Sequence, residues 1–209
     1  MRIVIPARKG SKGLPFKNRK LFKFTADIIP PPYVSSTYVF SDDHSILDLS
    51  NEYGFNSIVR PKEISVDTTS TKDTIKSLID ICEFSKDDLI VMLYLTYPER
   101  TWNEVIDAID YMKSFQAESL LCRKEMSTLS HLILLEENGS KGSQIYPHNT
   151  YRRQDSPVCF ELSHYISIFK CSSINNLNHN LYDLNTVYMP ISNSTIDVDT
   201  QKDLDNLYE

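Results

Sequence analysis

The chain has 209 residues, of which 41% are hydrophobic and 24% are charged, and its formal net charge is −6. This length suffices for one globular domain with its own core, and the composition excludes extensive disorder. The acidic balance argues against general binding to nucleic acid or to an anionic membrane surface, but it allows one basic pocket for a phosphate.

The cysteines and the apolar runs exclude further classes of protein. The four cysteines are widely spaced and form no C-x-x-C, so neither a disulfide framework nor a zinc site is indicated. The N-terminal apolar run turns polar directly after Pro6, too early for a signal peptide. No later segment approaches the length of a membrane span. We therefore expect a soluble, cytoplasmic protein that has no membrane partner.

Apolar runs alternate with segments of helical periodicity up to Cys122. In chain order the pattern predicts a strand at 2–6, a loop to about Asn18, a strand at 38–40, a helix at 44–53 ended by Gly54, a strand at 57–59, a helix at 71–84, a strand at 89–95, a helix at 102–115 and a strand at 118–122. This alternation predicts an α/β fold with a mainly parallel, doubly wound, Rossmann-like sheet.

The rhythm of the elements loosens after Lys124. Residues 138–149 are polar and contain glycine, which predicts a loop or the tip of a hairpin. Strands are expected at 165–169 and 186–189, and a closing helix at 200–208 with Thr200 as its N-cap. No repeat, low-complexity tract or linker divides the chain, so one domain is expected over residues 1–209.

A loop rich in glycine and basic residues follows the first strand, at residues 7–18. In open α/β sheets, ligands bind beyond the carboxyl ends of strands. Two glycines allow the backbone to approach an anion, and four cations surround them: Arg8, Lys9, Lys12 and Lys17. The combination suits a triphosphate. The alternative is a solvated basic turn. The loop matches neither the Walker A pattern nor G-x-G-x-x-G, so the ordinary P-loop and dinucleotide sites are excluded.

The same loop resembles the signature of the CMP-sialic acid synthetases (acylneuraminate cytidylyltransferases), A-R-x-x-S-K-G-[IL]-x-x-K-N, and fills every fixed position of it. The resemblance implies a domain of the nucleotide-sugar transferase type that moves CMP from CTP to the anomeric hydroxyl of an acidic 2-keto-3-deoxy sugar. Pyrophosphate is released, and the product serves polysaccharide biosynthesis. The resemblance also implies which residues bind the nucleotide, namely Ala7, Arg8, Ser11, Lys12, Gly13 and Asn18. It implies catalytic roles for Arg8, Lys12 and Lys17.

A second segment, residues 59–68, is similar to the family's R-P-x-x-L-x-x-D-T. The match implies that Arg60 and Thr71 read the cytosine edge, and a guanidinium can indeed donate to cytosine O2 and N3. The alternative for Arg60 is a surface charge. Ser41-Asp42 resembles the end of another strand of the family, with a helix cap as the alternative for the aspartate.

The segment Ile196-Asp197-Val198-Asp199-Thr200 brings two carboxylates into close sequence. Carboxylates one residue apart project to the same side of an extended segment and suit Mg²⁺ that is bound jointly with phosphates. The family ends in a similar I-D-[IV]-D-T, which implies that Asp197 and Asp199 hold the metal. The alternative is that Asp199 and Thr200 only cap the last helix.

The resemblance is weaker where the family binds the sugar. Residues 94–100 correspond to the family's Q-P-T-S-P-L-R. Tyr94 replaces the glutamine, whereas Pro98 and Arg100 are kept. The family's Asn-Gly pair is absent. By position, the sugar-binding candidates are Tyr94, Arg153 (with Arg152 as its alternative), Gln154, Ser163 and His164. These replacements predict that N-acetylneuraminate is a poor substrate. His164 is also a candidate general base, although an isolated histidine is more often structural.

Two further expectations concern the shape and the partners of the chain. The family has a full helix after the signature loop, but the prolines at 30–32 cannot lie inside one. The family's region after the central sheet is exchanged between subunits, which implies a homodimer and an arm for dimerisation and acceptor binding at residues 125–170. The rival functions are transfer to another acid, such as 3-deoxy-octulosonate, and a noncatalytic nucleotide-binding protein.

Overall fold

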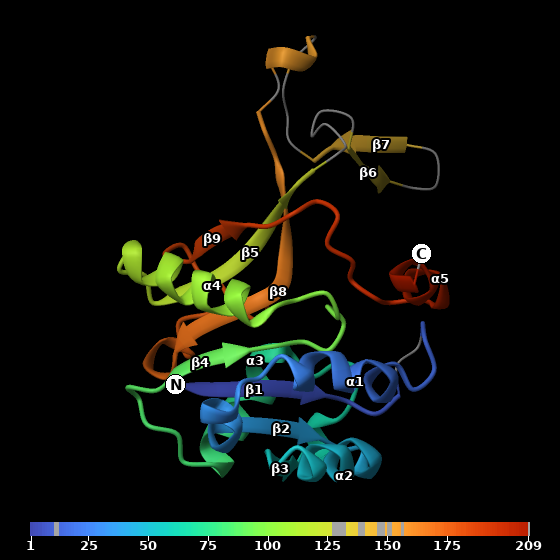
Figure 1. Cartoon of the computed structure of the whole chain (residues 1–209). Coiled ribbons are helices and arrows are strands. Elements are labelled where there is room, and N and C mark those ends of the chain that lie inside the picture. Colours follow the sequence, from blue (N-terminus) through green and yellow to red (C-terminus); the bar gives the residue numbers. More distant parts are fainter. Residues whose placement is uncertain are drawn as a thin grey trace.

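A computed structural model describes residues 1–10, 13–126, 133–137, 141–145, 149, 152–155 and 157–208. Its centre is a seven-stranded sheet of order β3-β2-β1-β4-β8-β5-β9 (Figure 1). The strands are β1 (Arg2–Ala7), β2 (Thr37–Ser41), β3 (Asn56–Val59), β4 (Leu89–Met92), β5 (Ser119–Glu125), β8 (Phe160–Lys170) and β9 (Val187–Pro190).

The sheet is mainly parallel, as predicted. The strands β1 to β4 run parallel to their neighbours in the order β3-β2-β1-β4, and β9 runs parallel to β5. The exception is β8, which lies antiparallel between β4 and β5. Ala7 of β1 pairs with Ser41 of β2, and Ser41 pairs with Val59 of β3, so the carboxyl ends of these strands meet at one edge of the sheet.

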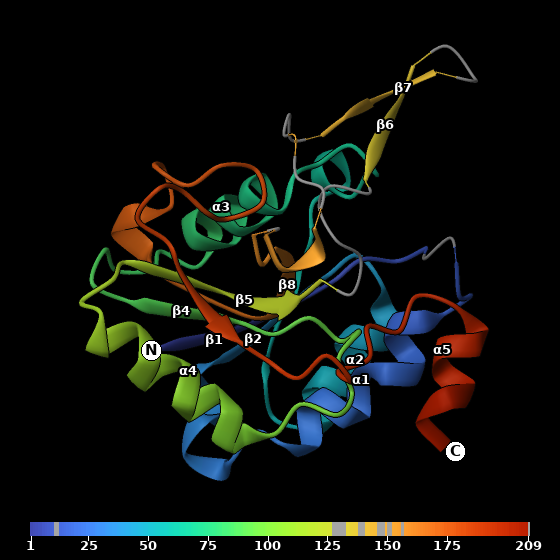
Figure 2. The same cartoon turned by 90° about the horizontal axis from the view of Figure 1, so that it is seen from above.

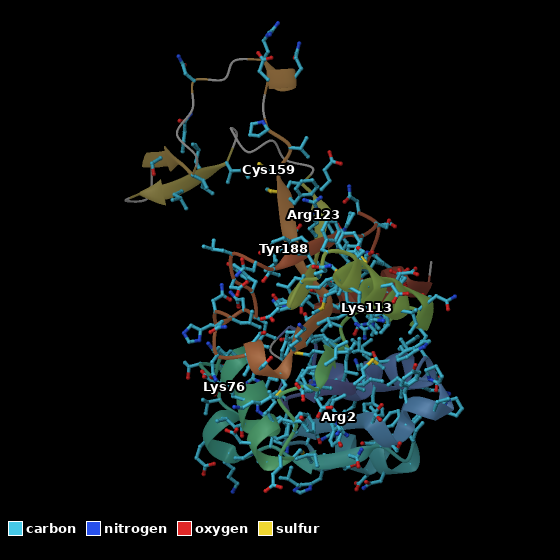
Figure 3. All side chains as sticks on the ribbon, turned by 90° about the vertical axis from the view of Figure 1, so that its left-hand side faces the viewer. Arg2, Lys76, Lys113, Arg123, Cys159 and Tyr188 are labelled. Carbon is cyan, nitrogen blue, oxygen red and sulfur yellow. The ribbon has the colours of Figure 1, made fainter. Side chains whose placement is uncertain are left out.

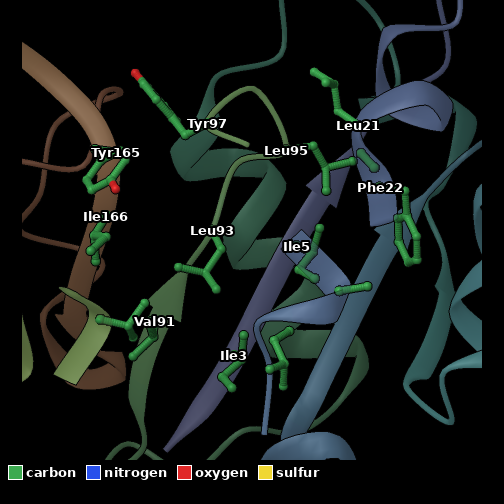
Figure 4. Packing of buried hydrophobic residues seen from close by; sticks show 14 of the residues in the cluster. Ile3, Ile5, Leu21, Phe22, Val91, Leu93, Leu95, Tyr97, Tyr165 and Ile166 are labelled. Atoms are coloured by element: carbon green, nitrogen blue, oxygen red, sulfur yellow. The ribbon is translucent and has the colours of Figure 1, made fainter. Parts of the chain in front are cut away.

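Helices cover both faces of this sheet (Figure 2). They are α1 (Lys17–Asp27), α2 (His44–Glu52), α3 (Thr71–Ile81), α4 (Trp102–Ser114) and a short α5 (Gln201–Asp205). Because side chains alternate along a strand, Ile3 and Ile5 pack with α1 and α4, whereas Val4 packs with α3. Figure 4 shows the first of these two cores around Ile3, Ile5 and Leu21. The doubly wound arrangement is thereby confirmed.

The helix after β2 begins and ends where its sequence signals lie. The Asp43 side chain accepts a hydrogen bond from the Ser45 N–H and caps α2. At the other end Gly54 has a φ of 74°, and the Gly54 and Phe55 N–H groups donate to the carbonyls of Asn51 and Ser50. This is the Schellman pattern, which favours glycine at that position.

The first helix is the main local correction to the sequence prediction. The predicted loop extends to about Asn18, but α1 begins at Lys17 and continues to Asp27. Its buried residues are Leu21, Phe22, Thr25 and Ala26. Their spacing is that of one helical face. No helix was predicted here because the prolines downstream were given more weight than this spacing. The prediction that these prolines end the helix is confirmed, since α1 stops before Pro30 and a 3-10 helix, Pro31–Ser36, follows.

An arm extends from the body where β5 and β8 continue beyond the sheet (Figure 1). We use the name arm for the described residues between Glu125 and Leu162. It includes the antiparallel hairpin of β6 (Leu134–Glu137) and β7 (Lys141–Gln144), and a 3-10 turn, Arg153–Asp155. Figure 3 shows Arg123 at the base of the arm and Cys159 farther out. A loop or hairpin tip was predicted at 138–149, of which residues 138–140 and 146–148 lie outside the described part of the chain.

None of the helices that the structure describes is long and apolar enough to span a membrane.

Candidate functional site

A cavity of about 390 Å³ opens at the carboxyl edge of the sheet. Its walls come from the end of β1, the start of α1, the segments that follow β3 and β4, the start of α3, β8 and the segment before α5. This is where open α/β sheets bind ligands. It is lined by Pro6, Arg8, Lys17, Asn18, Arg60, Val66, Asp67, Thr69, Thr71, Thr74, Tyr94, Leu95, Thr96, Tyr97, His164, Asp197 and Asp199.

The signature loop forms the basic wall of the cavity. Leu14, only 1% exposed, anchors the loop in the core, and the Lys17 N–H donates to the Leu14 carbonyl over 3.1 Å. The Asn18 amide donates to the Arg8 carbonyl over 2.8 Å, so the two sides of the loop are tied together. The Arg8 guanidinium forms an ion pair with Asp67. Ser11 and Lys12 lie outside the described residues, so their predicted roles stay predictions.

Gly13 lies directly against the aspartate segment. A Cβ built on Gly13 would come 2.4 Å from the carbonyl oxygen of Asp199, closer than real Cβ atoms approach backbone. The absence of a side chain therefore allows the loop to pack on the segment that carries the two carboxylates.

Replacing Gly13 with alanine should displace the loop from that segment. A shift of about 1 Å at a binding site can weaken function by as much as ~100-fold. For CTP, the nucleotide that the sequence resemblance implies, we expect weaker binding by titration calorimetry, by roughly tenfold or more on the same grounds. A Gly13→Ala protein with unaltered CTP affinity would show that this contact does not shape the nucleotide site.

The two carboxylates project together, as the spacing predicts. Val198 is fully buried and its N–H donates to the Thr96 carbonyl over 2.8 Å, while Asp197 and Asp199 are exposed on the opposite side. The Lys17 ammonium lies 2.6 Å from Asp199 Oδ1. The alternative holds for Thr200 alone, whose side chain caps α5 in a capping box with Asp203.

The pair has the chemistry of a magnesium site. Asp197 Oδ2 accepts from Tyr97, and Asp199 Oδ1 faces Lys17, which leaves one oxygen of each carboxylate without a hydrogen bond to the described residues. No group of three or more histidine, cysteine or acidic side chains that could hold a metal occurs among the residues described. Mg²⁺ commonly uses one or two carboxylates and completes its shell with water and phosphate, so the pair fits this ion.

Arg60 is a buried residue that lines the cavity, and it is not a surface charge. It is 6% exposed, its Nε donates to the Ile64 carbonyl over 3.0 Å, and its Nη2 donates to Thr74 Oγ1 over 3.0 Å. Burial lowers the pKa of the guanidinium from its usual value, but a group of such high pKa stays charged. Thr71 lies beside it and shares a 2.9 Å hydrogen bond with the Tyr94 hydroxyl.

Three rings form the remaining wall. The Tyr94 and His164 rings meet edge to face, with 5.6 Å between centroids. The Tyr97 hydroxyl donates to Asp197 Oδ2 over 2.8 Å and accepts from the Ser163 hydroxyl over 3.3 Å. Burial raises the pKa of the Tyr97 hydroxyl, which therefore keeps its proton and can hold the carboxylate in place.

Arg100 is buried next to this wall and binds its backbone. Only 2% of it is exposed, and it donates to the Tyr94 carbonyl over 2.9 Å and to the Tyr165 carbonyl over 2.6 Å. Burial lowers its pKa to about 10, so it remains a cation at neutral pH. Arg100 thus ties the segment after β4 to β8.

Of the predicted site residues that the structure describes in full, four do not line the cavity. Ala7 is buried at the end of β1, where its carbonyl accepts from the Ser41 hydroxyl, and Gly13 faces the Asp199 carbonyl. Ser163 is buried behind Tyr97. Gln154 is exposed on the arm, and the side chain of Arg153 lies outside the described part. The predicted sugar-binding roles of the last three stay predictions.

Sequence reasoning missed several lining residues, among them Tyr97 and Asp67. Tyr97 occupies a serine position of the family's Q-P-T-S-P-L-R, and this enlargement was the signal that could have found it. Asp67, the aspartate of the D-T pair, is the ion-pair partner of Arg8. Asp42 is not the helix cap considered for it: its carboxylate accepts from the Lys9 N–H over 2.7 Å, and Asp43 is the cap.

Comparison with known proteins gives sequence relatives and structural neighbours of one kind. No protein-family model matches the chain. An N-acylneuraminate cytidylyltransferase of Streptococcus agalactiae serotype V is 25% identical over 162 residues, which are 73% of this chain and 39% of that protein. The chain thus spans about two fifths of the length of that curated relative.

Two solved structures share the fold. A CMP:2-keto-3-deoxy-manno-octonic acid synthetase complexed with CTP has a TM-score of 0.66 at 16% identity, covering 99% of this chain and 95% of that one. The 4-diphosphocytidyl-2C-methyl-D-erythritol synthase of Anaerococcus prevotii has a TM-score of 0.65 at 13% identity, covering 99% and 96%. The chain is therefore a relative of the N-acylneuraminate cytidylyltransferases in sequence, and it has the fold of the cytidylyltransferases, a class of nucleotidyltransferases.

Proposed function

We propose that the chain transfers CMP from CTP to the anomeric hydroxyl of an acidic 2-keto-3-deoxy sugar and releases pyrophosphate. One observation carries this proposal. A single cavity brings together the basic loop residues Arg8 and Lys17, the buried Arg60 and the carboxylates of Asp197 and Asp199. Phosphoryl transfer needs positioning and charge stabilisation more than covalent chemistry, and these groups supply both.

The phosphate-binding cations already have partners in this cavity. Arg8 is paired with Asp67, and Lys17 with Asp199. Both pairs are partly exposed, so exchanging a carboxylate for a phosphate oxygen costs little. In the proposed complex the two cations contact the phosphates and stabilise the charge that develops on the leaving pyrophosphate. Lys12 would act with them.

Asp197 and Asp199 are the residues that would hold Mg²⁺, which when bound supplies Lewis-acid polarisation of a phosphate oxygen. Tyr97 keeps Asp197 in one orientation through its 2.8 Å hydrogen bond. Lys17, at the first position of α1, lies between the carboxylates and the loop and can follow Asp199 or the nucleotide.

Recognition of the base is proposed for Arg60 and Thr71. Arg60 is fixed through Nε and Nη2, while its Nη1 makes no hydrogen bond to any residue described and remains as a donor for cytosine O2 or N3. The fixed guanidinium loses little side-chain entropy on binding, which favours a specific nucleotide.

Pyrophosphate release tests the proposal directly. CTP, Mg²⁺ and a panel of N-acetylneuraminate, other nonulosonates and 3-deoxy-octulosonate should give release with at least one acid, and ATP, GTP and UTP should not replace CTP. Release from another nucleotide at the same rate would contradict the assignment of the base. Tight CTP binding without turnover on any acid would favour the noncatalytic rival.

The choice of acceptor follows from the substituted wall. Tyr94 and His164 match, by the sequence resemblance, positions where the family binds its sugar, and both line the cavity together with Tyr97, so N-acetylneuraminate is proposed to be a poor substrate and another nonulosonate the preferred one. Transfer to 3-deoxy-octulosonate remains the alternative. Polysaccharide biosynthesis, a cytoplasmic location and the absence of nucleic-acid binding are part of the same proposal, the last supported by the net charge of −6.

A homodimer is also proposed, on the evidence of the arm. Large apolar side chains are exposed along it, namely Leu134, Leu135, Ile145, Val158, Phe160 and Leu162. Exposed large apolar side chains gathered on one extension favour an interaction surface there. Gln154 and the backbone of Arg153 lie on the same arm. In the proposed dimer, the arm of one chain would bring these residues toward the cavity of the other chain.

We expect light scattering at micromolar concentration to give the mass of two chains. Exposed leucines on the arm should then carry the association, and Leu134→Lys with Leu135→Lys should shift the mass toward one chain. A single-chain mass for the unaltered protein would contradict the dimer, and Arg153 would then have to serve its own cavity.

A further inference from the structure

The pairing between β5 and β8 contains a large bulge beside the cavity. Leu120 pairs with Ile168 and Cys122 pairs with Ser163, so a step of two residues along β5 faces a step of five along β8. The extra residues lie between Ser163 and Ile168 on β8. On its other edge β8 keeps a regular register with β4 from Lys170 to Ser167. Bulges of this kind redirect side chains and are frequent beside active sites.

The bulge places the His164 ring within hydrogen-bond distance of the Ser167 hydroxyl. His164 Nδ1 lies 3.2 Å from Ser167 Oγ. In a regular strand, side chains three residues apart point to opposite faces and their Cα atoms are separated by about 10 Å. The contact therefore depends on the bulge that interrupts the regular strand between the two residues. Ser167 is fully buried and sets a fixed anchor for one nitrogen of the ring.

The His164 imidazole also packs against the Tyr94 ring, and its second ring nitrogen has no hydrogen bond to the described residues. Tyr94 packs against the ring at an interplanar angle of 76°, and the Tyr94 hydroxyl is itself held by Thr71. His164 lines the cavity, and its Nε2 makes no hydrogen bond within the part of the chain that is described. When Nδ1–H donates to Ser167, the lone pair of Nε2 is a hydrogen-bond acceptor inside the cavity.

The surroundings keep this imidazole neutral. Burial lowers the pKa of His164 from its usual value, and the carboxylate of Asp197 opposes the shift only in part. The other groups on this wall are the hydroxyls of Tyr94 and Tyr97, whose pKa values burial raises, and the Arg60 cation. Among these groups, only the neutral imidazole offers a basic lone pair that can accept a proton during the reaction.

We propose that His164 is the general base of the transfer, a role that rests on the proposed function. Nε2 takes the proton from the anomeric hydroxyl of the acceptor, and the oxygen forms a bond to the α-phosphorus of CTP. The bond between the α-phosphorus and the bridging oxygen breaks, and pyrophosphate leaves with that electron pair. The imidazolium then returns its proton to water, so charge and atoms balance over the cycle.

The test compares His164→Ala and His164→Gln with the unaltered chain. His179→Ala is the matched control, because His179 is exposed and does not line the cavity. General acid–base catalysis contributes about 10²–10⁴-fold, so kcat of both His164 variants should fall by an amount in that range. CTP affinity by calorimetry should stay unchanged. Added imidazole should restore part of the kcat of His164→Ala, which has room for it, and not of His164→Gln.

The outcomes separate the two proposals. If the unaltered chain turns over CTP and His164→Ala keeps its kcat, the general base is wrong and the proposed function stands. If His164→Gln keeps the kcat that His164→Ala loses, the ring has a steric or hydrogen-bonding role, and the general base is again wrong. An unaltered chain that releases pyrophosphate with none of the acids contradicts the proposed function, and this role falls with it.

Discussion

Replacing Asp197 with asparagine is expected to lower kcat/KM by roughly 10²–10³-fold, in line with losing a group that stabilises transition-state charge. The carboxylate offers Oδ1 to the cavity while Oδ2 accepts from Tyr97. Asparagine keeps the shape and can still accept from Tyr97, so the loss isolates the charge. Because Asp197 is exposed, the free energy of unfolding should change by about 0.5 kcal/mol or less.

A matched control lies in the next helix. Asp205 is exposed on α5 and accepts from the Gln201 amide, outside the cavity, so Asp205→Asn should leave turnover unaltered. The Mg²⁺ dependence of pyrophosphate release should move to higher concentration in Asp197→Asn alone. Normal turnover of Asp197→Asn at low Mg²⁺ would show that this carboxylate does not serve the reaction.

Replacing Lys17 with alanine should reduce turnover by a comparable factor of roughly 10²–10³, because the proposed function assigns to this cation the stabilisation of the leaving pyrophosphate. The Lys17–Asp199 pair joins a side chain 13% exposed to one 68% exposed. Partly exposed pairs contribute about 0–1 kcal/mol, so folding should be almost unaffected. The signature of the change is therefore a large loss of kcat with a small loss of stability.

Lys20→Ala is the control for this second change. Lys20 lies on the same helix, is exposed and does not line the cavity, so its loss should alter neither quantity. Single-turnover kinetics and urea unfolding of both variants measure the two effects separately. A Lys17→Ala protein that unfolds much more easily yet turns over normally would make Lys17 a structural residue.

Local patterns in the sequence predicted much of the fold, and the motifs in it predicted many of the residues that line the cavity. Apolar runs and helical spacing give the alternation of β1 to β5 with α2, α3 and α4, since each signal lies within one element. Gly54 and Thr200 mark helix ends for the same reason. The two aspartates project together because Val198 between them is buried, a result of the two-residue period alone.

What the sequence did not predict depends on contacts between distant segments. Nothing local to β8 says that it runs antiparallel between β4 and β5, or that its register slips by several residues near His164. Tyr97 joins Asp197 only after β4 and the C-terminal segment have met. The Ser163 hydroxyl reaches Tyr97 only because β8 and the segment after β4 lie together in the fold, and its predicted contact with the sugar stays a prediction. The start of α1 was missed because the glycines and prolines near it outweighed its buried face.

The central claim is that this cavity joins CMP to an acidic sugar. Phosphorus NMR of a reaction with CTP, Mg²⁺ and the acid that gives the fastest pyrophosphate release measures this directly. The three resonances of CTP should be replaced by those of pyrophosphate and of one phosphodiester, whose carbon partner is the anomeric centre of the acid. Resonances of CTP that persist, or that convert to CDP and phosphate without a phosphodiester, would contradict the claim.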